Sequence, residues 1–251
     1  MDLRERSATA LAPHAPLPRY YAPQLKAQFL RGVFERAAPD YDRVERMMAL
    51  GTGSRYRRRA LIRAGLGKGM KVLDVAAGTG MVAREAASVV GAAGRVIGLD
   101  PSRGMLAELV SRVSIPAVLA TGELLPLADG SFDFLSMGYA LRHLSDLSAA
   151  LREFHRVLRP GGIACLLEIT APRRRLPRML LRGYLAGLVP CLSRLNARHA
   201  DSQVLWRYYW DTIDACVPPP RVLQAMEQAG FAHVTRHTEL GVFSEYTGRK
   251  G

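Results

Sequence analysis

The middle of the chain alternates short, mostly apolar runs with segments in which apolar residues recur at helical spacing. The runs occupy residues 70–75, 95–99, 117–120, 132–137 and 163–169, and the helical spacing occurs at 81–90, 105–112 and 147–158. Runs that are apolar at successive positions are typical of strands buried on both faces. The alternation therefore predicts an α/β fold, in which helices cover both faces of a mostly parallel sheet.

Regions without this alternation flank the predicted sheet. Residues 1–20 are rich in Ala and Pro, so we expect a loose arm there, followed by one domain over residues 21–251. Residues 24–63 have helical patterning that is interrupted at two glycines. Residues 173–215 are predicted to form a helical lid between the fifth and sixth strands, and two strands close the domain after it.

The composition fits one globular domain with a basic surface. The 251 residues are 49% hydrophobic, and 35 Lys and Arg against 22 Asp and Glu give a net charge of +13. Such a surface attracts phosphates, anionic lipid headgroups or nucleic acid. The three cysteines, Cys165, Cys191 and Cys216, lack zinc-type spacing, and no apolar run reaches the roughly 18 residues that span a bilayer. We therefore expect a cytoplasmic protein with free thiols, no metal site and no signal peptide.

A glycine-rich turn after the first predicted strand is the clearest candidate binding site. The strand runs into Ala76-Ala77-Gly78-Thr79-Gly80, and a helix follows. Small residues let the backbone approach a ligand, and a helix N-terminus offers free N–H donors. The second strand ends at Asp100, about 20 residues further on, where a carboxylate can bind ribose hydroxyls. The turn alone is compatible with a dinucleotide site or with a tight turn that binds nothing.

Further motifs along the chain help to decide what, if anything, the glycine-rich turn binds. Glu123-Leu124-Leu125-Pro126 precedes Ser131-Phe132-Asp133, and Arg156-Val157-Leu158-Arg159-Pro160-Gly161-Gly162 precedes the fifth strand. With residues 74–80 and Asp100, these segments resemble the successive motifs of class I methyltransferases. Tyr139-Ala140-Leu141-Arg142-His143-Leu144-Ser145-Asp146 is similar to the Phe-Gly-Leu-Arg-Asn motif of the ubiquinone/menaquinone biosynthesis C-methyltransferase family. Val33-Phe34, Tyr41-Asp42 and Ala229-Gly230-Phe231 extend the resemblance over most of residues 30–251.

The resemblance implies a Rossmann-like sheet of seven strands whose last strand is antiparallel, a helical N-terminal region, and S-adenosylmethionine as cofactor. Gly78 and Gly80 would lie against the methionine portion of the cofactor, Asp100 would bind its ribose, and Thr121 with Gly122 would contact its adenine. The full set of cofactor residues that the resemblance implies is Asp74, Ala76, Gly78, Thr79, Gly80, Asp100, Pro101, Thr121, Gly122 and Glu123.

Four residues, Arg142, His143, Tyr41 and Asp42, are candidates for catalysis. Arg142 occupies the family's substrate-side arginine position, where a guanidinium would stabilise an oxyanion or orient a water, although a helix-start salt bridge is also compatible with it. His143 has a side chain suited to general base catalysis, or it caps a helix at the surface. Tyr41 and Tyr139 are candidate pocket walls or core residues. Asp42 is a candidate base or a helix cap.

The departures from the family pattern cluster on the acceptor side. Glu45-Arg46 stands where the family usually has Asn-Asp, His143 replaces Asn, and Ser244-Glu245-Tyr246 replaces Ala-Leu-His. We therefore assign Arg46, Tyr139 and Tyr246 to the acceptor site, with Arg46 facing the pocket. The cofactor positions are largely kept, so the acceptor is the part of the reaction that the sequence specifies least.

The basic lid suggests what the acceptor could be. Residues 173–200 contain seven arginines and no acid, interleaved with leucines. This pattern suits peripheral contact with a membrane surface, or arginines that bind a diphosphate, or simply a solvated face. The leading function is therefore C-methylation of a prenylated quinol or related isoprenoid, with a prenyl diphosphate as an alternative acceptor and phospholipid N-methylation as an alternative reaction. No nucleic-acid motif is present, and a homodimer is compatible with the sequence.

Overall fold

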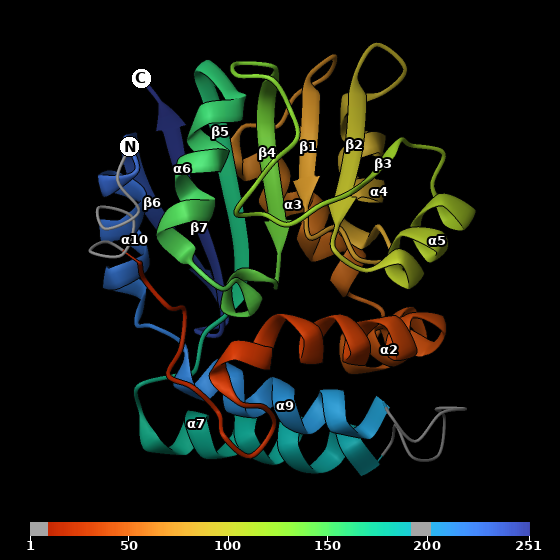
Figure 1. Ribbon diagram of the computed structural model, residues 1–251, viewed down its shortest axis with the longest axis vertical. Helices are drawn as coiled ribbons and strands as arrows, with labels where there is room; N and C mark the ends of the chain where they lie inside the picture. Colours follow the sequence, from red (N-terminus) through yellow and green to blue (C-terminus); the bar gives the residue numbers. More distant parts are fainter. Residues whose placement is uncertain (1–9, 192–201) are drawn as a thin grey trace.

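The computed structural model describes residues 10–191 and 202–251 (Figure 1), so parts of the expected arm (1–9) and of the expected lid (192–201) lie outside the described residues. A sheet of seven strands in the order β3-β2-β1-β4-β5-β7-β6 forms the centre. Its strands are β1 (Lys71–Val75), β2 (Arg95–Asp100), β3 (Ala117–Leu119), β4 (Phe132–Gly138), β5 (Leu158–Ile169), β6 (Phe231–Glu239) and β7 (Phe243–Lys250).

The pairing within the sheet confirms the predicted fold class. Neighbours from β3 to β5 pair in parallel, whereas β7 pairs antiparallel with both β5 and β6. The carboxyl ends of the parallel strands therefore meet at one edge of the sheet, where ligands of open α/β sheets bind.

Helices cover both faces of this sheet (Figure 1). On one face of the sheet, Val72 of β1 packs into the apolar core shared with α3 (Gly53–Ala64) and α4 (Met81–Val90). The next residue, Leu73, packs into the opposite core with α6 (Leu147–Val157) and α10 (Pro219–Gln228). Successive side chains of a strand point to opposite faces, which explains why the buried strands are apolar at every position. The helix α5 (Arg103–Arg112) packs beside β2 and β3.

A further helical layer lies across the carboxyl edge of the sheet (Figure 1). It contains α2 (Lys26–Met48), which follows the 3₁₀ turn η1 (Pro23–Leu25), and the helices α7 (Arg175–Arg182) and α9 (Ser202–Ala215), with the π-helical segment η3 (Gly183–Leu188) after α7. Val33 and Val44 of α2 share one apolar cluster with Leu185 of η3 and Ile213 of α9. Segments from the two ends of the chain thus build the cover over the sheet edge.

The segment that we expected to be a loose arm is attached to the domain in its described part. The Leu11 carbonyl accepts a hydrogen bond from the Leu147 N–H (2.9 Å), and the Pro13 carbonyl accepts one from the Val217 N–H (2.8 Å). The next residue, His14, is buried. Ala and Pro content indicated the lack of a helix here, but it carried no information on these long-range contacts. Among the described residues, none of the helices combines the length and apolar character needed to cross a bilayer.

Candidate active site

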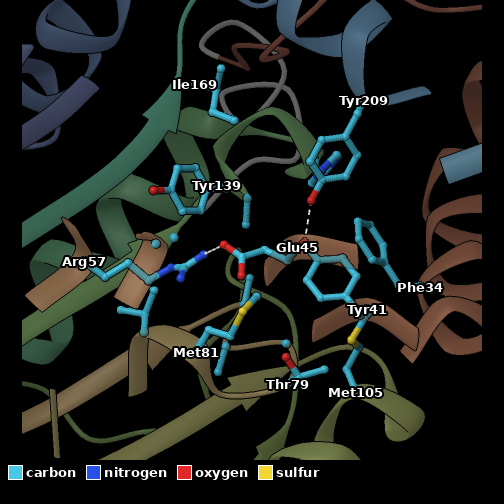
Figure 2. A pocket seen from close by; sticks show the side chains of 18 of the residues that line it. Phe34, Tyr41, Glu45, Arg57, Thr79, Met81, Met105, Tyr139, Ile169 and Tyr209 are labelled. Carbon is cyan, nitrogen blue, oxygen red and sulfur yellow. Dashed lines mark hydrogen bonds and ion pairs between the residues drawn. The ribbon is translucent and has the colours of Figure 1, made fainter. Parts of the chain in front are cut away.

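A cavity of about 700 Å³ lies between the carboxyl ends of the strands and the helical layer (Figure 2). Its cofactor half is formed by residues that follow β1, β2 and β3, namely Ala76, Gly78, Thr79, Pro101, Thr121, Gly122 and Glu123, together with Asp74 and Asp100 within the strands. Its acceptor half is formed mainly by helical residues and Tyr139, which include Phe34, Tyr41, Glu45, Arg57, Leu185 and Tyr209.

The glycine-rich turn holds the β2 carboxylate in place. Ala76 and Gly78 have positive φ values of 53° and 56°, which turn the backbone so that the Gly78 N–H points at β2. This N–H donates to Asp100 Oδ2 at 2.9 Å, and the Ser102 N–H donates to the other oxygen at 2.8 Å. Burial raises the pKa of Asp100 to about 6. The geometry suits a carboxylate that accepts further hydrogen bonds from ribose hydroxyls.

Asp74 is the second carboxylate of the cofactor half. It is fully buried, Ser136 Oγ donates to its Oδ1 at 2.6 Å, and its Oδ2 has no hydrogen-bond partner among the described residues. Burial raises the pKa of Asp74 to about 7. A buried carboxylate oxygen without a partner is costly unless a ligand supplies a donor. The ammonium group of S-adenosylmethionine is a suitable donor, so the residues of this half fit that cofactor.

The opposite end of the cofactor half is a tight turn at Thr121–Leu124. A Cβ on Gly122 would lie 3.2 Å from Leu144 and 3.3 Å from Val75, so glycine allows the turn to pack closely against both side chains. The Glu123 carboxylate accepts a hydrogen bond from the Ser145 N–H at 2.6 Å. The side chain of Glu123 therefore holds the neighbouring loop, while the residues of the turn line the cavity.

Two predicted residues lie behind the cavity wall instead of in it. Gly80 caps α4 with a φ of 86°, and a Cβ there would lie 3.1 Å from Leu109, so this glycine allows α4 and α5 to pack closely. Asp42 is buried, accepts a hydrogen bond from Thr79 Oγ1 and forms an ion pair with Arg112. Asp42 thus ties α2 to the cofactor turn, and its carboxylate does not line the cavity as a base would.

Arg142 is fully buried and is not among the residues that line the cavity. Its guanidinium forms an ion pair with Glu168 and donates to the Tyr139 carbonyl at 2.7 Å. It also lies 4.4 Å from the centre of the Tyr209 ring. Tyr139 and Tyr209 do line the cavity. In this structure Arg142 is therefore a positioning residue that holds two aromatic walls.

The aromatic walls come from three separate segments. Tyr139 follows β4 with a positive φ of 60°, an uncommon conformation for an aromatic residue, which the Arg142 hydrogen bond supports. Tyr41 of α2 and Tyr209 of α9 share a hydrogen bond of 2.5 Å between their hydroxyls. Burial raises the pKa of Tyr41, Tyr139 and Tyr209, so these hydroxyls stay protonated. Tyr41 and Tyr139 line the cavity where the sequence suggested pocket walls.

His143 lines the same cavity, and neither of its ring nitrogens has a hydrogen-bond partner among the described residues. Its ring stacks on Tyr208 at 5.7 Å and meets the edge of Phe34 at 5.1 Å. Burial and the positive charges of Arg142 and Lys26 hold the pKa of His143 well below its usual value. The imidazole is therefore neutral at physiological pH and carries one unprotonated nitrogen.

Two predicted acceptor residues lie elsewhere. Arg46 is exposed on α2 and does not line the cavity, because the preceding residue, Glu45, occupies the inward position and successive helix residues differ by about 100°. Tyr246 is only 2% exposed and belongs to the sheet core, with the Arg236 guanidinium 5.9 Å from its ring. Neither residue lines the cavity, so their assignment to the acceptor site has no geometric support.

The sequence-based assignment missed the residues that fill the centre of the acceptor half. Figure 2 shows Glu45 between Arg57 and Tyr41, with an ion pair joining Glu45 to Arg57. Phe34, Ile169 and Met81 complete the apolar surroundings. Glu45 stands where the family usually has Asn, which was a usable signal, but Arg46 beside it also departs from the family pattern and carries a charge.

Comparison with known proteins identifies the family. The model of the ubiE/COQ5 methyltransferase family matches residues 23–250. A ubiquinone/menaquinone biosynthesis C-methyltransferase UbiE from Geobacter sulfurreducens is 31% identical over 90% of each chain, and one from Syntrophotalea carbinolica is 34% identical over 88% of this chain and 94% of its own. A SAM-dependent methyltransferase structure from Thermotoga maritima matches the fold with a TM-score of 0.64 at 20% identity, covering 88% of this chain and 99% of that one. The chain therefore belongs to the ubiE/COQ5 family and is an S-adenosylmethionine-dependent methyltransferase.

Proposed function

We propose that this enzyme methylates a ring carbon of a prenylated quinol. The observation that carries the proposal is that one cavity contains both halves of the site. Asp74 and Asp100 line its cofactor half, and aromatic and aliphatic side chains line the acceptor half beside it. A flat ring fits between aromatic walls such as Tyr41 and Tyr139. The names of the relatives, which are C-methyltransferases of ubiquinone and menaquinone biosynthesis, support the same acceptor.

The residues that line the cavity position the acceptor for this reaction and exclude water from it. When bound, S-adenosylmethionine supplies an electrophilic methyl group on its sulfonium. Methyl transfer is an in-line displacement, so holding the acceptor carbon against the methyl group provides much of the rate increase. The apolar surfaces of Phe34, Leu185 and Ile169 exclude water from the acceptor half. The neutral, unpartnered His143 can accept a hydrogen bond from a hydroxyl of the acceptor.

The test supplies methyl-labelled S-adenosylmethionine to the purified enzyme with separate acceptors. One reaction contains a lipid extract with demethylated quinols kept reduced, and another contains geranyl and farnesyl diphosphate. We expect label in the quinol fraction. Label in neither quinol nor diphosphate would contradict the proposed class of acceptor.

A prenyl diphosphate is a second candidate because exposed arginines line the cavity, two of them close together on α3. Arg55 and Arg59 lie one turn apart on α3, and neither forms an ion pair with a described residue. Guanidinium groups in such a pair suit bidentate contacts with phosphate. Arg46, which we expected in this role, does not line the cavity. Label in the diphosphate reaction alone would favour this acceptor.

The cavity is less suited to phospholipid N-methylation. Its aromatic walls could surround a cation, but the carboxylate beside them, Glu45, already pairs with Arg57. A cationic headgroup would therefore lie next to a guanidinium. A third reaction with phosphatidylethanolamine vesicles tests this alternative, and we expect no label there.

We also propose that α7 rests on an anionic membrane surface. Leu176, Met179 and Leu180 are exposed on one side of this helix, at 66–68% of their full accessibility. Three arginines, Arg175, Arg178 and Arg182, flank them on the same short helix. Apolar side chains that enter the headgroup region beside arginines are typical of interfacial helices.

The homodimer that is compatible with the sequence stays a prediction.

A further inference from the structure

An ion pair lies among the aromatic and aliphatic side chains of the acceptor half. Glu45 comes from α2 and Arg57 from α3, and the carboxylate oxygen Oε1 pairs with the guanidinium nitrogen Nη2. The two side chains are 18% and 4% exposed. Figure 2 places the pair between the Tyr139 ring and Met81, at the junction of the cofactor and acceptor halves.

The backbone is arranged to leave room for this pair. A Cβ on Gly53 would lie 2.8 Å from Arg57 Nη1 and 2.8 Å from Glu45 Oε1, so any larger residue would displace one partner. The Arg57 guanidinium also lies 5.6 Å from the centre of the Tyr139 ring. A buried ion pair adds little net stability compared with apolar residues of similar size. Its presence in a substrate cavity therefore calls for a chemical role.

Two atoms of the pair have unused hydrogen-bonding capacity. Arg57 Nε is buried and has no partner among the described residues. Glu45 Oε2 accepts no hydrogen bond from the described part of the chain, where only Oε1 is engaged. Nε lies on the same edge of the planar guanidinium as Nη2, the atom that pairs with Glu45. One free donor and one free acceptor therefore belong to the same ion pair.

A hydroxyl group matches this arrangement because it can accept from Nε–H and donate to the carboxylate at the same time. A quinone carbonyl can only accept, and a diphosphate offers no donor and is repelled by Glu45. An unsubstituted alkene would leave both atoms unpaired. We propose that Glu45, held by Arg57, is a catalytic residue that binds a hydroxyl of the acceptor ring and takes its proton. This inference rests on the proposed function and restricts the acceptor to the reduced, hydroxylated ring.

The proton and electron balance of the step is simple. The hydroxyl proton passes to Glu45 while electrons from the oxygen move into the ring and the neighbouring ring carbon forms the bond to the methyl group. The bond between methyl and sulfur breaks, and its electron pair stays on sulfur. The ring regains aromaticity when the proton on the methylated carbon is lost to solvent and the oxygen recovers a proton from Glu45. One proton is released overall, and no oxidant or reductant is needed.

The experiment measures turnover and cofactor binding for Glu45→Gln, Glu45→Ala and Arg57→Lys beside the wild type. The acceptor is a short-chain demethylated naphthoquinol kept reduced. We expect kcat of Glu45→Gln to fall by about 10²–10⁴-fold, the usual contribution of general base catalysis, with an unchanged cofactor Kd. Added formate should restore part of the activity of Glu45→Ala. Asp129→Asn, which removes an exposed ion-pair carboxylate far from the cavity, should behave as wild type.

A second measurement uses the unmodified enzyme and so does not depend on the folding of any variant. The two mono-O-methyl ethers of the same naphthoquinol are compared with the parent compound. We expect at least one ether to lose more than 100-fold in kcat/KM, because the blocked oxygen can no longer donate to Glu45. If both ethers react as well as the parent, or if Glu45→Gln keeps its kcat, the inference is wrong while the proposed function stands. If the wild type methylates no quinol at all, the proposed function itself fails.

Discussion

The two halves of the cavity are built in different ways. The cofactor half uses turns that follow neighbouring strands, so its contacts, such as the Gly78 N–H to Asp100, arise within one sheet edge. The acceptor half joins side chains from distant parts of the chain: Tyr41 and Tyr209, for example, are 168 positions apart and share a hydrogen bond. A motif can therefore describe the first half, whereas only the packing of α2, α3, η3 and α9 creates the second.

Arg142 holds two aromatic walls of the acceptor half, and its replacement should have the largest effect. Arg142→Met leaves Glu168 buried without its ion-pair partner, which typically costs about 3–5 kcal/mol of folding free energy. Denaturant unfolding of the purified proteins measures this loss. Arg142→Met combined with Glu168→Gln removes the unpaired charge and should recover part of it. Unchanged stability with lost turnover would instead place Arg142 at the acceptor, as the family resemblance implied.

Asp100→Ala should affect the cofactor half alone. The variant loses a carboxylate that faces the cavity and accepts two backbone hydrogen bonds, so S-adenosylmethionine should bind more weakly by about 1–3 kcal/mol. Isothermal titration calorimetry with the cofactor product measures the change. Acceptor affinity should stay within twofold of wild type, and equal cofactor affinity would remove Asp100 from the ribose site.

The sequence was sufficient for the fold, and it brought most of the expected cofactor residues to one edge of the sheet. Strand alternation and the resemblance predicted the seven-stranded sheet with its antiparallel strand, and Asp74, Gly78 and Asp100 line or shape the cavity because they end or follow adjacent parallel strands. Gly80 shows the limit of this reasoning. It follows the same turn, yet it is required for the packing of α4 against Leu109.

The acceptor half could not be derived in the same way. The inward side of α2 depends on the helical layer that covers it, so the sequence did not distinguish Glu45 from Arg46. The partner of Glu45 is Arg57, one of several arginines in 55–59 that have the same local pattern. Likewise, the contact of Arg142 with Glu168 depends on the pairing of β4 with β5. Long-range contacts, and not local preferences, decide these positions.

The raised pKa values of Asp74 and Asp100 in the cofactor half predict that cofactor binding depends on pH. Asp74 has a pKa of about 7 and Asp100 of about 6, and the contacts that we expect them to make with the cofactor require both carboxyl groups to be ionised. Affinity for S-adenosylmethionine should therefore fall about tenfold per pH unit just below pH 7, or about 1.4 kcal/mol. Calorimetry between pH 8 and 6 measures the slope, and a flat profile would contradict the role of Asp74.

The same shifts have the opposite consequence for the cofactor-free protein. A carboxyl group whose folded pKa exceeds its unfolded value binds protons more strongly in the folded state, so stability decreases as the pH rises from about 4 towards 7. Asp74→Asn should remove this destabilising charge and raise the melting temperature at pH 8, while it weakens cofactor binding. A variant that is less stable at pH 8 would show that the Asp74 charge is compensated in the absence of cofactor.

The smallest effect is expected at the outer face of the helical layer, where α7 should meet lipid. Arg175→Gln should weaken binding to anionic vesicles by about 1 kcal/mol, or about fivefold, since each basic residue near the surface contributes about that much. Sedimentation with vesicles measures the loss, and Arg152→Gln, an exposed arginine on α6, is the matched control. Leu176→Ser with Leu180→Ser should reduce binding to neutral vesicles as well, because these side chains are exposed on α7 and would enter the bilayer irrespective of its charge. If the arginine and leucine variants bind vesicles as the wild type does, α7 does not contact the membrane. The acceptor would then enter the cavity without help from α7, and the helical layer over the acceptor half would serve only to exclude water.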